Sequence, residues 1–297
     1  MTQPQRIGFI GLGMMGLPMT TCLSKAGHAL FLADADAGRL SEIATSLGAT
    51  RLDTDNAKSL DVLITMLPNS AIVESVLLGS EGSQGWAAVL PRGAIVIDMS
   101  SSEPARSREL GLKLKALGLD YLDAPVSGGV KRAVDGTLAI LVGGELAVME
   151  RCRSLLDAMG KNILHIGTAG SGHAAKALNN YVSAAGLMAT VEALHVAKRF
   201  GIEPEVMVDV LNASSGRSNT SENKAKQFML SGSFASGFSM QLMNKDLKIA
   251  RGLADAVDYP LHLGNPAIAL WDEVSKQSTP TTDHTEMYRL LANNDSE

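Results

Sequence analysis

The chain has 297 residues, of which 45% are hydrophobic and 19% are charged, with a formal net charge of -5 at pH 7. A chain of this length and composition can bury a sizeable core and is expected to form two domains. The acidic balance argues against a nucleic-acid partner, and no apolar run approaches the roughly 18 residues of a membrane span, so we expect no membrane partner either.

The two cysteines, Cys22 and Cys152, are far apart in the sequence and form no C-x-x-C motif. This spacing indicates neither a disulfide framework nor a zinc site, so we expect no metal. Such cysteine usage suits a reducing compartment, and we predict a cytoplasmic protein.

From Arg6 to about Ile166, short apolar runs rich in β-forming residues alternate with longer amphipathic stretches. This alternation predicts β-α-β units and a parallel-rich sheet, with turns supplied by glycine, proline, asparagine and aspartate. The candidate strands are Ile7–Ile10, Ala29–Ala33, Val62–Met66, Ala94–Asp98, Asp120–Ala124 and Leu138–Val142.

After Gly167 the pattern changes, and long helical stretches dominate. We therefore expect an α/β domain over residues 1–166 and an all-helical domain over residues 167–297, which begins with a long interdomain helix. The candidate helices are Ala174–Phe200, Pro204–Ala213, Asn244–Ala256 and Pro266–Lys276.

A glycine-rich turn follows the first candidate strand and opens a predicted helix. Gly11 permits the tight turn, Gly13 lets backbone N–H groups approach a pyrophosphate, and Gly16 allows the helix to pack closely on the strand. Three glycines in a loop can serve only a turn, but their position in the first β-α unit predicts a Rossmann-type dinucleotide site. The predicted cofactor-binding turn consists of Gly11, Leu12, Gly13, Met14, Met15 and Gly16.

An acidic residue, Asp34, ends the second candidate strand. A carboxylate about 20 residues beyond the glycines can accept hydrogen bonds from the adenosine ribose, and it would repel a 2′-phosphate. Because Ala35 follows where NADP-binding chains carry an arginine, we predict NAD rather than NADP. Arg39 is close enough in sequence to keep NADP open, and a surface aspartate in a turn is the alternative interpretation.

The ends of two further strands fit a cofactor crevice, because ligands in open α/β sheets bind outside the carboxyl ends of the strands. Met66, Leu67 and Pro68 are expected along the adenosine and ribose side, and Ser101 near the nicotinamide ribose. On spacing alone, these are ordinary loop residues.

A turn after the fifth candidate strand contains Ser127, Gly128 and Gly129. Such a turn exposes consecutive backbone N–H groups and suits a carboxylate, which needs donors and room. The alternative is a loop without a ligand.

Lys176 and Asn180 lie four residues apart in an alanine-rich, mostly apolar helical stretch. They therefore project from one face of the predicted helix. Burial would lower the pKa of the lysine towards the range in which it exchanges protons near neutral pH. The alternative is a lysine that extends to the surface.

Four motifs of this chain occur in order and at similar separations to those of the β-hydroxyacid dehydrogenase family, which the sequence resembles over essentially its whole length. They are G-L-G-x-M-G from Gly11, D-A-P-V-S-G-G from Asp123, G-x-G-x-x-x-K-x-x-N-N from Gly170 and L-M-x-K-D-L from Leu242.

The resemblance implies an NAD-dependent enzyme that oxidises a 3-hydroxy acid or reduces its semialdehyde, as a homodimer or homotetramer whose helical domain serves substrate binding and oligomerisation. It implies that Lys176 exchanges the hydroxyl proton during hydride transfer. The other residues implied by the family are Ser127, Gly128, Gly129, Asn179 and Asn180 for substrate, and Lys245 for the cofactor, with Asp246 capping or pairing with Lys245. We predict Phe238 as a further substrate residue, because it can supply an apolar wall.

The chain departs from the family pattern at two places. Lys131 and Arg132 stand where small residues are frequent, and either they are solvated or they contact a second polar or anionic group of the substrate. Asn219 and Thr220 lie in a loop where several relatives place an aromatic residue. This weakens the case for a purely aliphatic substrate, although Phe238 can supply an apolar wall.

The resemblance favours a 3-hydroxyisobutyrate-like dehydrogenase and leaves three alternatives open. The first is a reductase of tartronate semialdehyde or a related polar semialdehyde. The second is a non-catalytic NAD(P)-binding module, against which Lys176 and Asn180 argue. The third, an imine reductase or a 6-phosphogluconate dehydrogenase, fits less well, because the former usually replaces the lysine and the latter is much longer.

Overall fold

The computed structural model describes residues 4–293. The chain divides into two compact units, Met1–Lys176 (unit 1) and Ala177–Glu297 (unit 2). This division falls inside helix α9 (Ser171–Phe200), whereas the predicted boundary at residues 166 and 167 precedes that helix. The start of α9 groups with unit 1 because its backbone is hydrogen-bonded to the side chain of Asp123 in unit 1.

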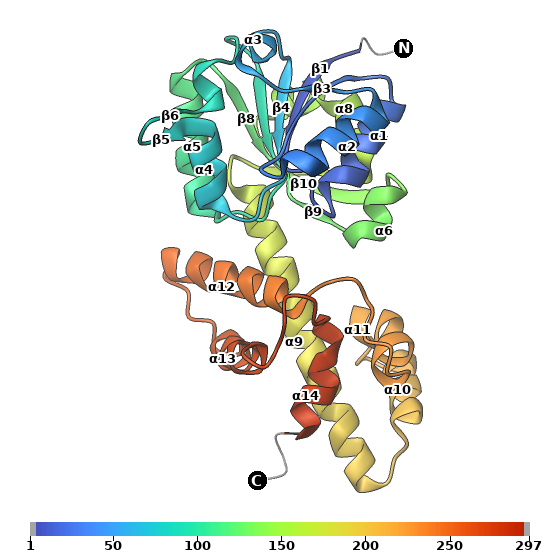
Figure 1. Ribbon diagram of the computed structural model, residues 1–297. Coiled ribbons are helices and arrows are strands. Elements are labelled where there is room, and N and C mark those ends of the chain that lie inside the picture. The colour runs from blue at the N-terminus through green and yellow to red at the C-terminus, as the bar shows by residue number, and fades with distance from the viewer. Residues whose placement is uncertain (1–3, 294–297) are drawn as a thin grey trace. The chain divides into compact units, whose positions relative to one another are not determined.

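Unit 1 is built on a nine-stranded sheet of β1 (Arg6–Ile10), β2 (Ala29–Ala33), β3 (Thr50–Arg51), β4 (Val62–Thr65), β7 (Ile95–Asp98), β8 (Asp120–Asp123), β9 (Val126–Ser127), β10 (Leu138–Gly144) and β11 (Gly160–Gly167). Six strands run parallel in the order β3-β2-β1-β4-β7-β8. Figure 1 shows the strands of unit 1 between helices that lie on either side of them. β10 is antiparallel to β8 and β9, and β11 is parallel to β10. The order reverses direction between β1 and β4, which is where doubly wound sheets bind ligands.

All six predicted strands are present, with small shifts at their ends. The prediction missed β3, β9, β11 and a short hairpin of β5 (Gly79–Ser80) and β6 (Ser83–Gln84). Strands of two residues are too short to show periodicity. The side chains of β11 are mostly exposed, so no alternation of burial marks this edge strand in the sequence.

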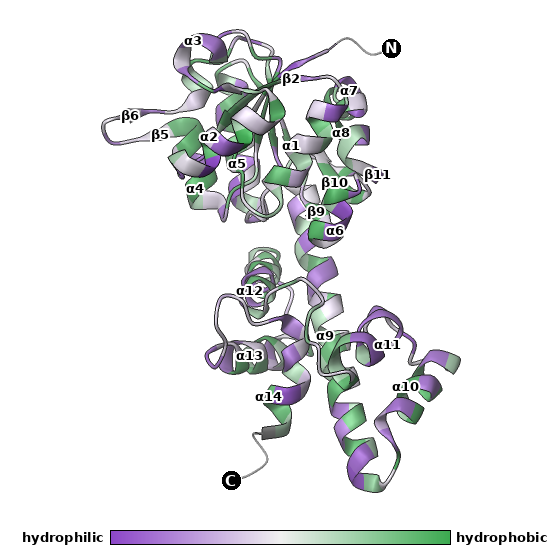
Figure 2. Ribbon diagram, turned by 45° about the vertical axis from the view of Figure 1, so that its right-hand side comes forward, coloured by the Kyte–Doolittle hydropathy of each residue, from purple (hydrophilic) through white to green (hydrophobic). Residues whose placement is uncertain are grey.

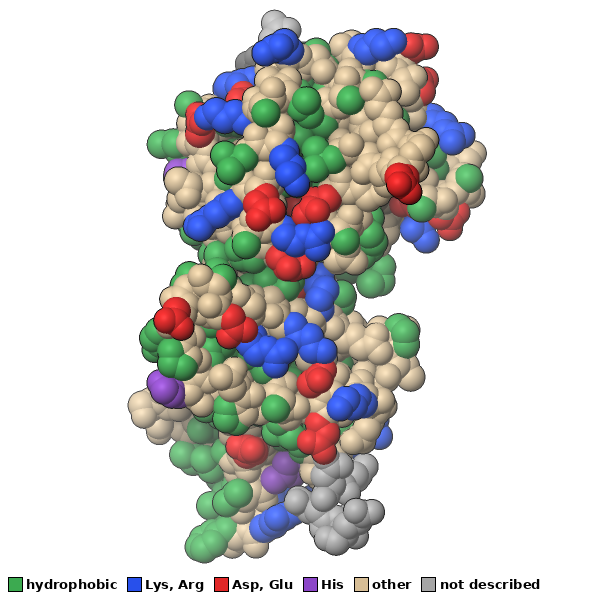
Figure 3. Space-filling model, turned by 90° about the vertical axis from the view of Figure 1, so that its left-hand side faces the viewer, with side chains coloured by type: hydrophobic (Ala, Val, Ile, Leu, Met, Phe, Trp, Pro, Cys, Tyr) green, Lys and Arg blue, Asp and Glu red, His purple; other side chains and the backbone are tan. Residues whose placement is uncertain are grey.

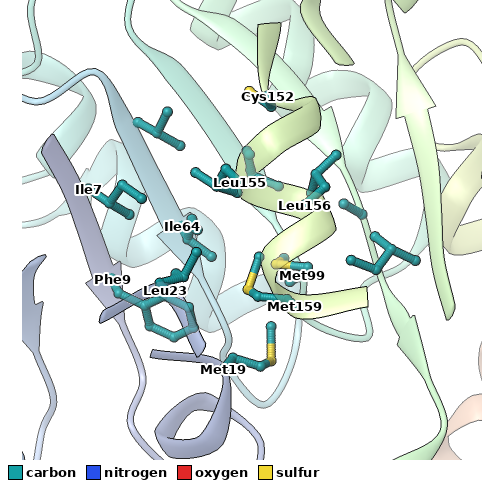
Figure 4. Close-up of a cluster of buried hydrophobic side chains, with 14 of the residues drawn as sticks. Ile7, Phe9, Met19, Leu23, Ile64, Met99, Cys152, Leu155, Leu156 and Met159 are labelled. Carbon is teal, nitrogen blue, oxygen red and sulfur yellow. The ribbon is translucent and has the colours of Figure 1, made fainter. Parts of the chain in front are cut away.

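Helices cover both faces of the sheet, and the strands bury apolar side chains on both sides. Ile7 and Phe9 point into one hydrophobic cluster, while Leu63 and Val96 belong to a second one. In the first cluster, side chains of α8 such as Leu155 face those of the strands (Figure 4). The helices of unit 1 are α1 (Gly16–Lys25), α2 (Ala37–Leu47), α3 (Thr54–Ala57), α4 (Ser70–Leu78), α5 (Pro104–Ala116), α6 (Gly129–Val134), α7 (Leu146–Arg151) and α8 (Arg153–Met159), with a 3-10 turn at Trp86–Ala88.

Unit 2 is helical apart from an isolated bridge between Ser239 and Asp283. Its hydrophobic core includes Trp271, which is fully buried. Hydrophobic and hydrophilic residues alternate along α9, α10 and α13, as expected of amphipathic helices that pack on one side (Figure 2). Besides α9, its elements are α10 (Pro204–Ala213), α11 (Asn219–Asn223), a π-helix (Ala225–Leu230), α12 (Met240–Ala256), α13 (Gly264–Ser275), a 3-10 turn (His284–Glu286) and α14 (Met287–Asn293).

The predicted helices of unit 2 are present, but three of them start earlier than predicted. α9 begins at Ser171, α12 at Met240 and α13 at Gly264. The hydroxyl of Ser239 accepts a hydrogen bond from the N–H of Leu242 and so caps α12 about one turn ahead of the predicted start at Asn244. The α/β fold with a parallel-rich sheet, joined by a long helix to an all-helical domain, is confirmed. Of the helices in residues 4–293, none combines the length and the apolar character that a membrane span needs.

Candidate active site

The glycine-rich turn between β1 and α1 leaves its backbone open to a ligand. Gly11 has a φ of 101°, and a Cβ there would lie 2.3 Å from the carbonyl oxygen of Met66, so only glycine fits. A Cβ at Gly16 would lie 1.9 Å from the carbonyl oxygen of Gly11, whereas one at Gly13 would meet nothing within 4 Å. No side chain caps α1, so its first N–H groups suit a pyrophosphate. Of the remaining residues in the turn, Leu12 is buried, Met15 is half-buried and Met14 is exposed.

Asp34 holds this turn against the end of β2. Its carboxylate accepts hydrogen bonds from the N–H of Leu12 at 2.6 Å and of Asp36 at 2.8 Å. Arg39, the residue that kept NADP open, lies 3.5 Å from Asp34 and 3.5 Å from Asp36. The negative charges of Asp34 and Asp36 therefore outnumber the positive charge of Arg39 at the end of β2, and this excess disfavours binding of a 2′-phosphate. The residues present fit an NAD molecule.

The loops that follow β4 and β7 are hydrogen-bonded to each other. The hydroxyl of Ser100 accepts from the N–H of Leu67 at 2.8 Å, and that of Ser70 accepts from the N–H of Glu103 at 2.8 Å. These bonds keep the predicted cofactor-binding loops together at the carboxyl ends of adjacent strands. Of the predicted residues in them, Met66, Leu67 and Ser101 are half-buried and Pro68 is exposed.

A buried carboxylate, Asp98, fixes the loop after β7. Asp98 is 1% exposed and accepts hydrogen bonds from the hydroxyls of Thr65 (2.9 Å) and Ser102 (2.8 Å) and from the N–H of Ser100 (3.1 Å). Each donor belongs to β4 or to the loop itself. The loop that contains Ser101 is therefore held from beneath by a carboxylate with several hydrogen-bond donors.

A second buried carboxylate, Asp123, anchors the start of α9. It accepts from the backbone N–H of Gly170 at 2.7 Å and of His173 at 2.8 Å, which places a negative charge at the positive end of the helix. A Cβ at Gly172 would lie 2.2 Å from the carbonyl oxygen of Leu141, so the helix start can approach β10 only with glycine there.

The side chain of His173 connects the start of α9 to the cofactor-binding loop. Its Nε2 lies 3.0 Å from the carbonyl oxygen of Ser100, and its Nδ1 lies 2.8 Å from the hydroxyl of Ser107. Because a carbonyl only accepts, Nε2 carries the proton of this bond. Lys176 follows His173 by three residues on the same helix, so this network sets the position of the helical turn that carries Lys176.

The predicted carboxylate turn has the backbone of an anion-binding loop. Ser127 ends β9, and Gly128 and Gly129 follow with φ values of 131° and 67°, which glycine adopts readily. Consecutive N–H groups in such a turn form a concave donor site. A Cβ at Gly128 would lie 2.4 Å from Cδ of Arg132, so the stem of the Arg132 side chain packs over the turn. Lys131 and Arg132 are both exposed.

In unit 2, Asn180 is buried and donates a hydrogen bond from Nδ2 to Asp246 at 2.6 Å. Its Oδ1 accepts from the exposed Asn179 at 3.1 Å. The ammonium of Lys245 lies 4.0 Å from the same Asp246. Asp246 thus contacts Asn180 as well as Lys245, a link between α9 and α12 that no sequence motif shows.

The loop around α11 has a polar interior. Thr220 is buried, whereas Asn219 is exposed, so the two polar residues singled out in this loop differ in environment. Phe238 is half-buried, and its ring forms a T-shaped contact with the imidazole of His284, with the centroids 5.8 Å apart. His284, together with Lys224, was not predicted as a site residue, because neither stands in a recognisable motif.

Comparisons with known proteins agree with this geometry. A family model described as the NAD binding domain of 6-phosphogluconate dehydrogenase matches residues 6–167. Another, described as NAD-binding of NADP-dependent 3-hydroxyisobutyrate dehydrogenase, matches residues 170–291. The 2-(hydroxymethyl)glutarate dehydrogenase of Eubacterium barkeri is 37% identical over 268 residues, which cover 90% of this chain and 88% of the relative. The chain belongs to the β-hydroxyacid dehydrogenase family.

Other β-hydroxyacid dehydrogenases are similar over nearly the whole chain. The 2-hydroxy-3-oxopropionate reductase of Escherichia coli is 34% identical, with 96% of this chain and 97% of the relative covered. A solved structure of 3-hydroxyisobutyrate dehydrogenase from Mycobacterium tuberculosis with L-serine has a TM-score of 0.89 and 31% identity, and the match covers 97% of this chain and 99% of that one. The predicted family, the cofactor NAD and the class of NAD-dependent dehydrogenase or semialdehyde reductase are confirmed.

Proposed function

We propose that this β-hydroxyacid dehydrogenase transfers hydride between NAD and a 3-hydroxy acid, with Lys176 as the general acid and base. The relatives named above act on 2-(hydroxymethyl)glutarate or on 2-hydroxy-3-oxopropionate. Both compounds carry a hydroxyl or aldehyde carbon next to the carbon that bears a carboxylate. A substrate with that arrangement is expected for this chain, either as the alcohol or, in the reductive direction, as a polar semialdehyde.

The observation that carries this proposal is the placement of Lys176. Lys176 lies in the first turns of α9, where the carboxylate of Asp123 accepts hydrogen bonds from the backbone. In the same part of the helix, His173 is hydrogen-bonded to the loop expected at the nicotinamide ribose. Asn180 follows one turn later on the same helix. A lysine held by such a framework can exchange a proton at a fixed position, as general acid–base catalysis requires.

Each proposed residue has a distinct part in the reaction. When bound, NAD accepts or supplies the hydride at its nicotinamide ring. We propose that Lys176 takes the proton of the 3-hydroxyl group through Nζ, and that the N–H groups of Ser127, Gly128 and Gly129 bind the carboxylate. Asn180 is proposed to orient the hydroxyl.

Further contacts with the substrate and the cofactor are proposed for residues outside these positions. Asn179 and Phe238 are proposed to line the substrate, and Arg132, whose stem packs over Gly128, is proposed to contact a second polar group of the substrate. Lys245 is proposed to contact the cofactor. The glycine-rich turn from Gly11 to Gly16, Asp34, Met66, Leu67, Pro68 and Ser101 complete the proposed cofactor site. A cytoplasmic location and a homodimer or homotetramer also stay predictions of the sequence.

An assay of NADH formation tests the proposal. The purified protein would be incubated with NAD and, in turn, with 3-hydroxyisobutyrate, 3-hydroxypropionate, glycerate, serine and threonate. We expect turnover of at least one of these 3-hydroxy acids. We expect Lys176→Ala to lower kcat by roughly two to four orders of magnitude while NADH binding stays nearly unchanged. Near-normal turnover of this variant would contradict the assigned mechanism.

A further inference from the structure

Lys224 is a cation of unit 2 that no carboxylate pairs with in residues 4–293. It lies between α11 and the π-helix, and its side chain is largely buried. Its ammonium is 3.0 Å from Nε2 of His284 and 3.4 Å from the hydroxyl of Ser183. Both partners are polar, but neither carries a negative charge under ordinary conditions.

The histidine beside Lys224 is neutral at physiological pH. Burial, together with the neighbouring Lys224, lowers the pKa of His284 to about 4. Nδ1 of His284 lies 3.0 Å from the carbonyl oxygen of Phe238, so Nδ1 carries the proton and Nε2 accepts one from Lys224. The imidazole therefore accepts a hydrogen bond from the ammonium of Lys224 but supplies no negative charge to balance it.

The nearest carboxylate is occupied elsewhere. Asp283 lies on the far side of the imidazole, with Oδ1 at 3.5 Å from Nδ1 of His284. Its oxygens accept hydrogen bonds from the hydroxyl groups of Ser236 and Thr285 and from the backbone N–H of Gly237. Burial raises the pKa of Asp283, but the hydrogen bonds from Thr285 and Ser236 outweigh burial and lower it. Asp283 attracts Lys224 only from a distance.

The neighbouring cation Lys226 has a different environment. Lys226, two residues further on, is more exposed and pairs with Asp209 at 2.5 Å. Cationic and anionic side chains lie side by side on the face drawn in Figure 3. Burial lowers the pKa of Lys224, and the distant Asp283 only partly counters this. A buried ammonium is unfavourable without a counter-charge, and a bound anion would supply it.

The ammonium is placed beside residues proposed to contact the substrate. Ser183 lies one helical turn after Asn180 on α9, and residues three apart share a helix face. Phe238, which accepts the hydrogen bond from His284, is itself a proposed substrate residue. The two hydrogen bonds to His284 and Ser183 leave Lys224 a third N–H group for a ligand.

We propose that Lys224 binds a second anionic group of the substrate, so that the preferred substrates are 3-hydroxy acids whose substituent ends in a carboxylate. This inference rests on the function proposed above. His284 and Ser183 orient the ammonium as positioning residues, and the substrate carboxylate accepts the remaining N–H. A neutral side chain on the substrate would leave the buried charge uncompensated and would bind less well.

Two probes separate the second carboxylate from the rest of the reaction. 2-(Hydroxymethyl)glutarate carries a distal carboxylate, and 3-hydroxyisobutyrate carries a methyl group in its place. We expect the wild type to have the higher kcat/KM for the dicarboxylate. We expect Lys224→Met to lower kcat/KM for the dicarboxylate by about 10- to 100-fold, mainly through a higher KM. The same variant should change kcat/KM for 3-hydroxyisobutyrate by less than about twofold.

Three further variants control for folding and for charge in general. Lys226→Met removes a neighbouring surface cation and should leave both substrates unchanged. Lys224→Arg keeps the charge and should keep most of the preference for the dicarboxylate. Lys176→Ala should inactivate the enzyme towards both probes. Thermal unfolding and NADH binding identify any variant that has lost its structure. If Lys224→Met is such a variant, the substrate preference of Lys224→Arg is compared with that of the wild type instead.

The possible results distinguish the two proposals. If the wild type oxidises neither probe nor any other 3-hydroxy acid of the panel, the proposed function is wrong. If the wild type oxidises 3-hydroxyisobutyrate but Lys224→Met affects both probes equally, or neither, only the second carboxylate site is overturned. If Lys224→Met loses activity towards the dicarboxylate and keeps it towards 3-hydroxyisobutyrate, both proposals are supported.

Discussion

The buried carboxylates of unit 1 and the ammonium of Lys224 in unit 2 are treated in opposite ways. In unit 1, Asp98 and Asp123 are almost inaccessible, and each receives hydrogen bonds from hydroxyl or backbone donors. In unit 2, Lys224 is also largely buried but faces a neutral imidazole and a hydroxyl. The first arrangement satisfies its charges with protein donors, and the second leaves its charge without a direct counter-ion.

This difference indicates that Asp98 and Asp123 have a structural role, whereas Lys224 is available to bind a ligand. A buried charge with a full set of partners fixes the elements that supply them, here the loop after β7 and the start of α9. A buried charge that lacks a counter-ion lowers the stability of the free protein, and such groups persist where they serve a ligand. Substitutions in the two clusters should therefore have opposite effects on stability.

The largest expected change in stability follows substitution of Asp123. Asp123→Ala leaves the N–H groups of Gly170 and His173 without their acceptor, and we expect it to destabilise unit 1 by about 3 kcal/mol. We also expect kcat to fall more than tenfold, because the turn that carries Lys176 loses its anchor. Urea unfolding and steady-state kinetics measure the two effects. Asp157→Ala, which removes a surface pair with Arg153, is the control and should change neither. Equal stability of the two variants would contradict the framework described for unit 1.

A pH-dependent effect of intermediate size is expected from His284. Its pKa is 6.5 in the unfolded chain and about 4 in the folded protein, so between these values the unfolded state binds the proton more readily. Its neutral form therefore stabilises the fold fully above pH 6.5, and about 2 kcal/mol of this is lost by pH 5 as the pH falls towards the folded pKa. Urea unfolding of wild type and His284→Gln at pH 7.5 and pH 5 checks this. The stability difference between them should shrink at the lower pH, and a constant difference would show that His284 does not titrate as described.

The smallest expected change has the opposite sign. Lys224→Met removes a buried charge but keeps an unbranched side chain of similar length. We expect this variant to be as stable as the wild type or more stable by about 0.5–1 kcal/mol, in contrast to Asp123→Ala. Thermal unfolding without substrate measures the difference. A loss of more than about 2 kcal/mol would place Lys224 with the structural charges and remove the contrast between the two units.

Much of the fold was predictable because its patterns are local. Six strands, four long helices and the glycine-rich turn each follow from periodicity or from turn residues within a few positions. The edge strand β11 was missed because its exposed side chains show no alternation. Among candidate site residues, the motif positions were found by spacing, whereas Lys224 and His284 are 60 residues apart and belong to no motif.

The sequence by itself determined the family, the cofactor class and the lysine proposed for catalysis, because the motifs that carry them are contiguous and each depends on local backbone geometry. Only the tertiary structure decided which charges are compensated. Asp123 meets the start of α9 through a contact between residues 50 positions apart, and Lys224 meets His284 rather than a carboxylate through a contact of similar range. Burial and charge pairing depend on such distant contacts, so they appear only once the chain has folded.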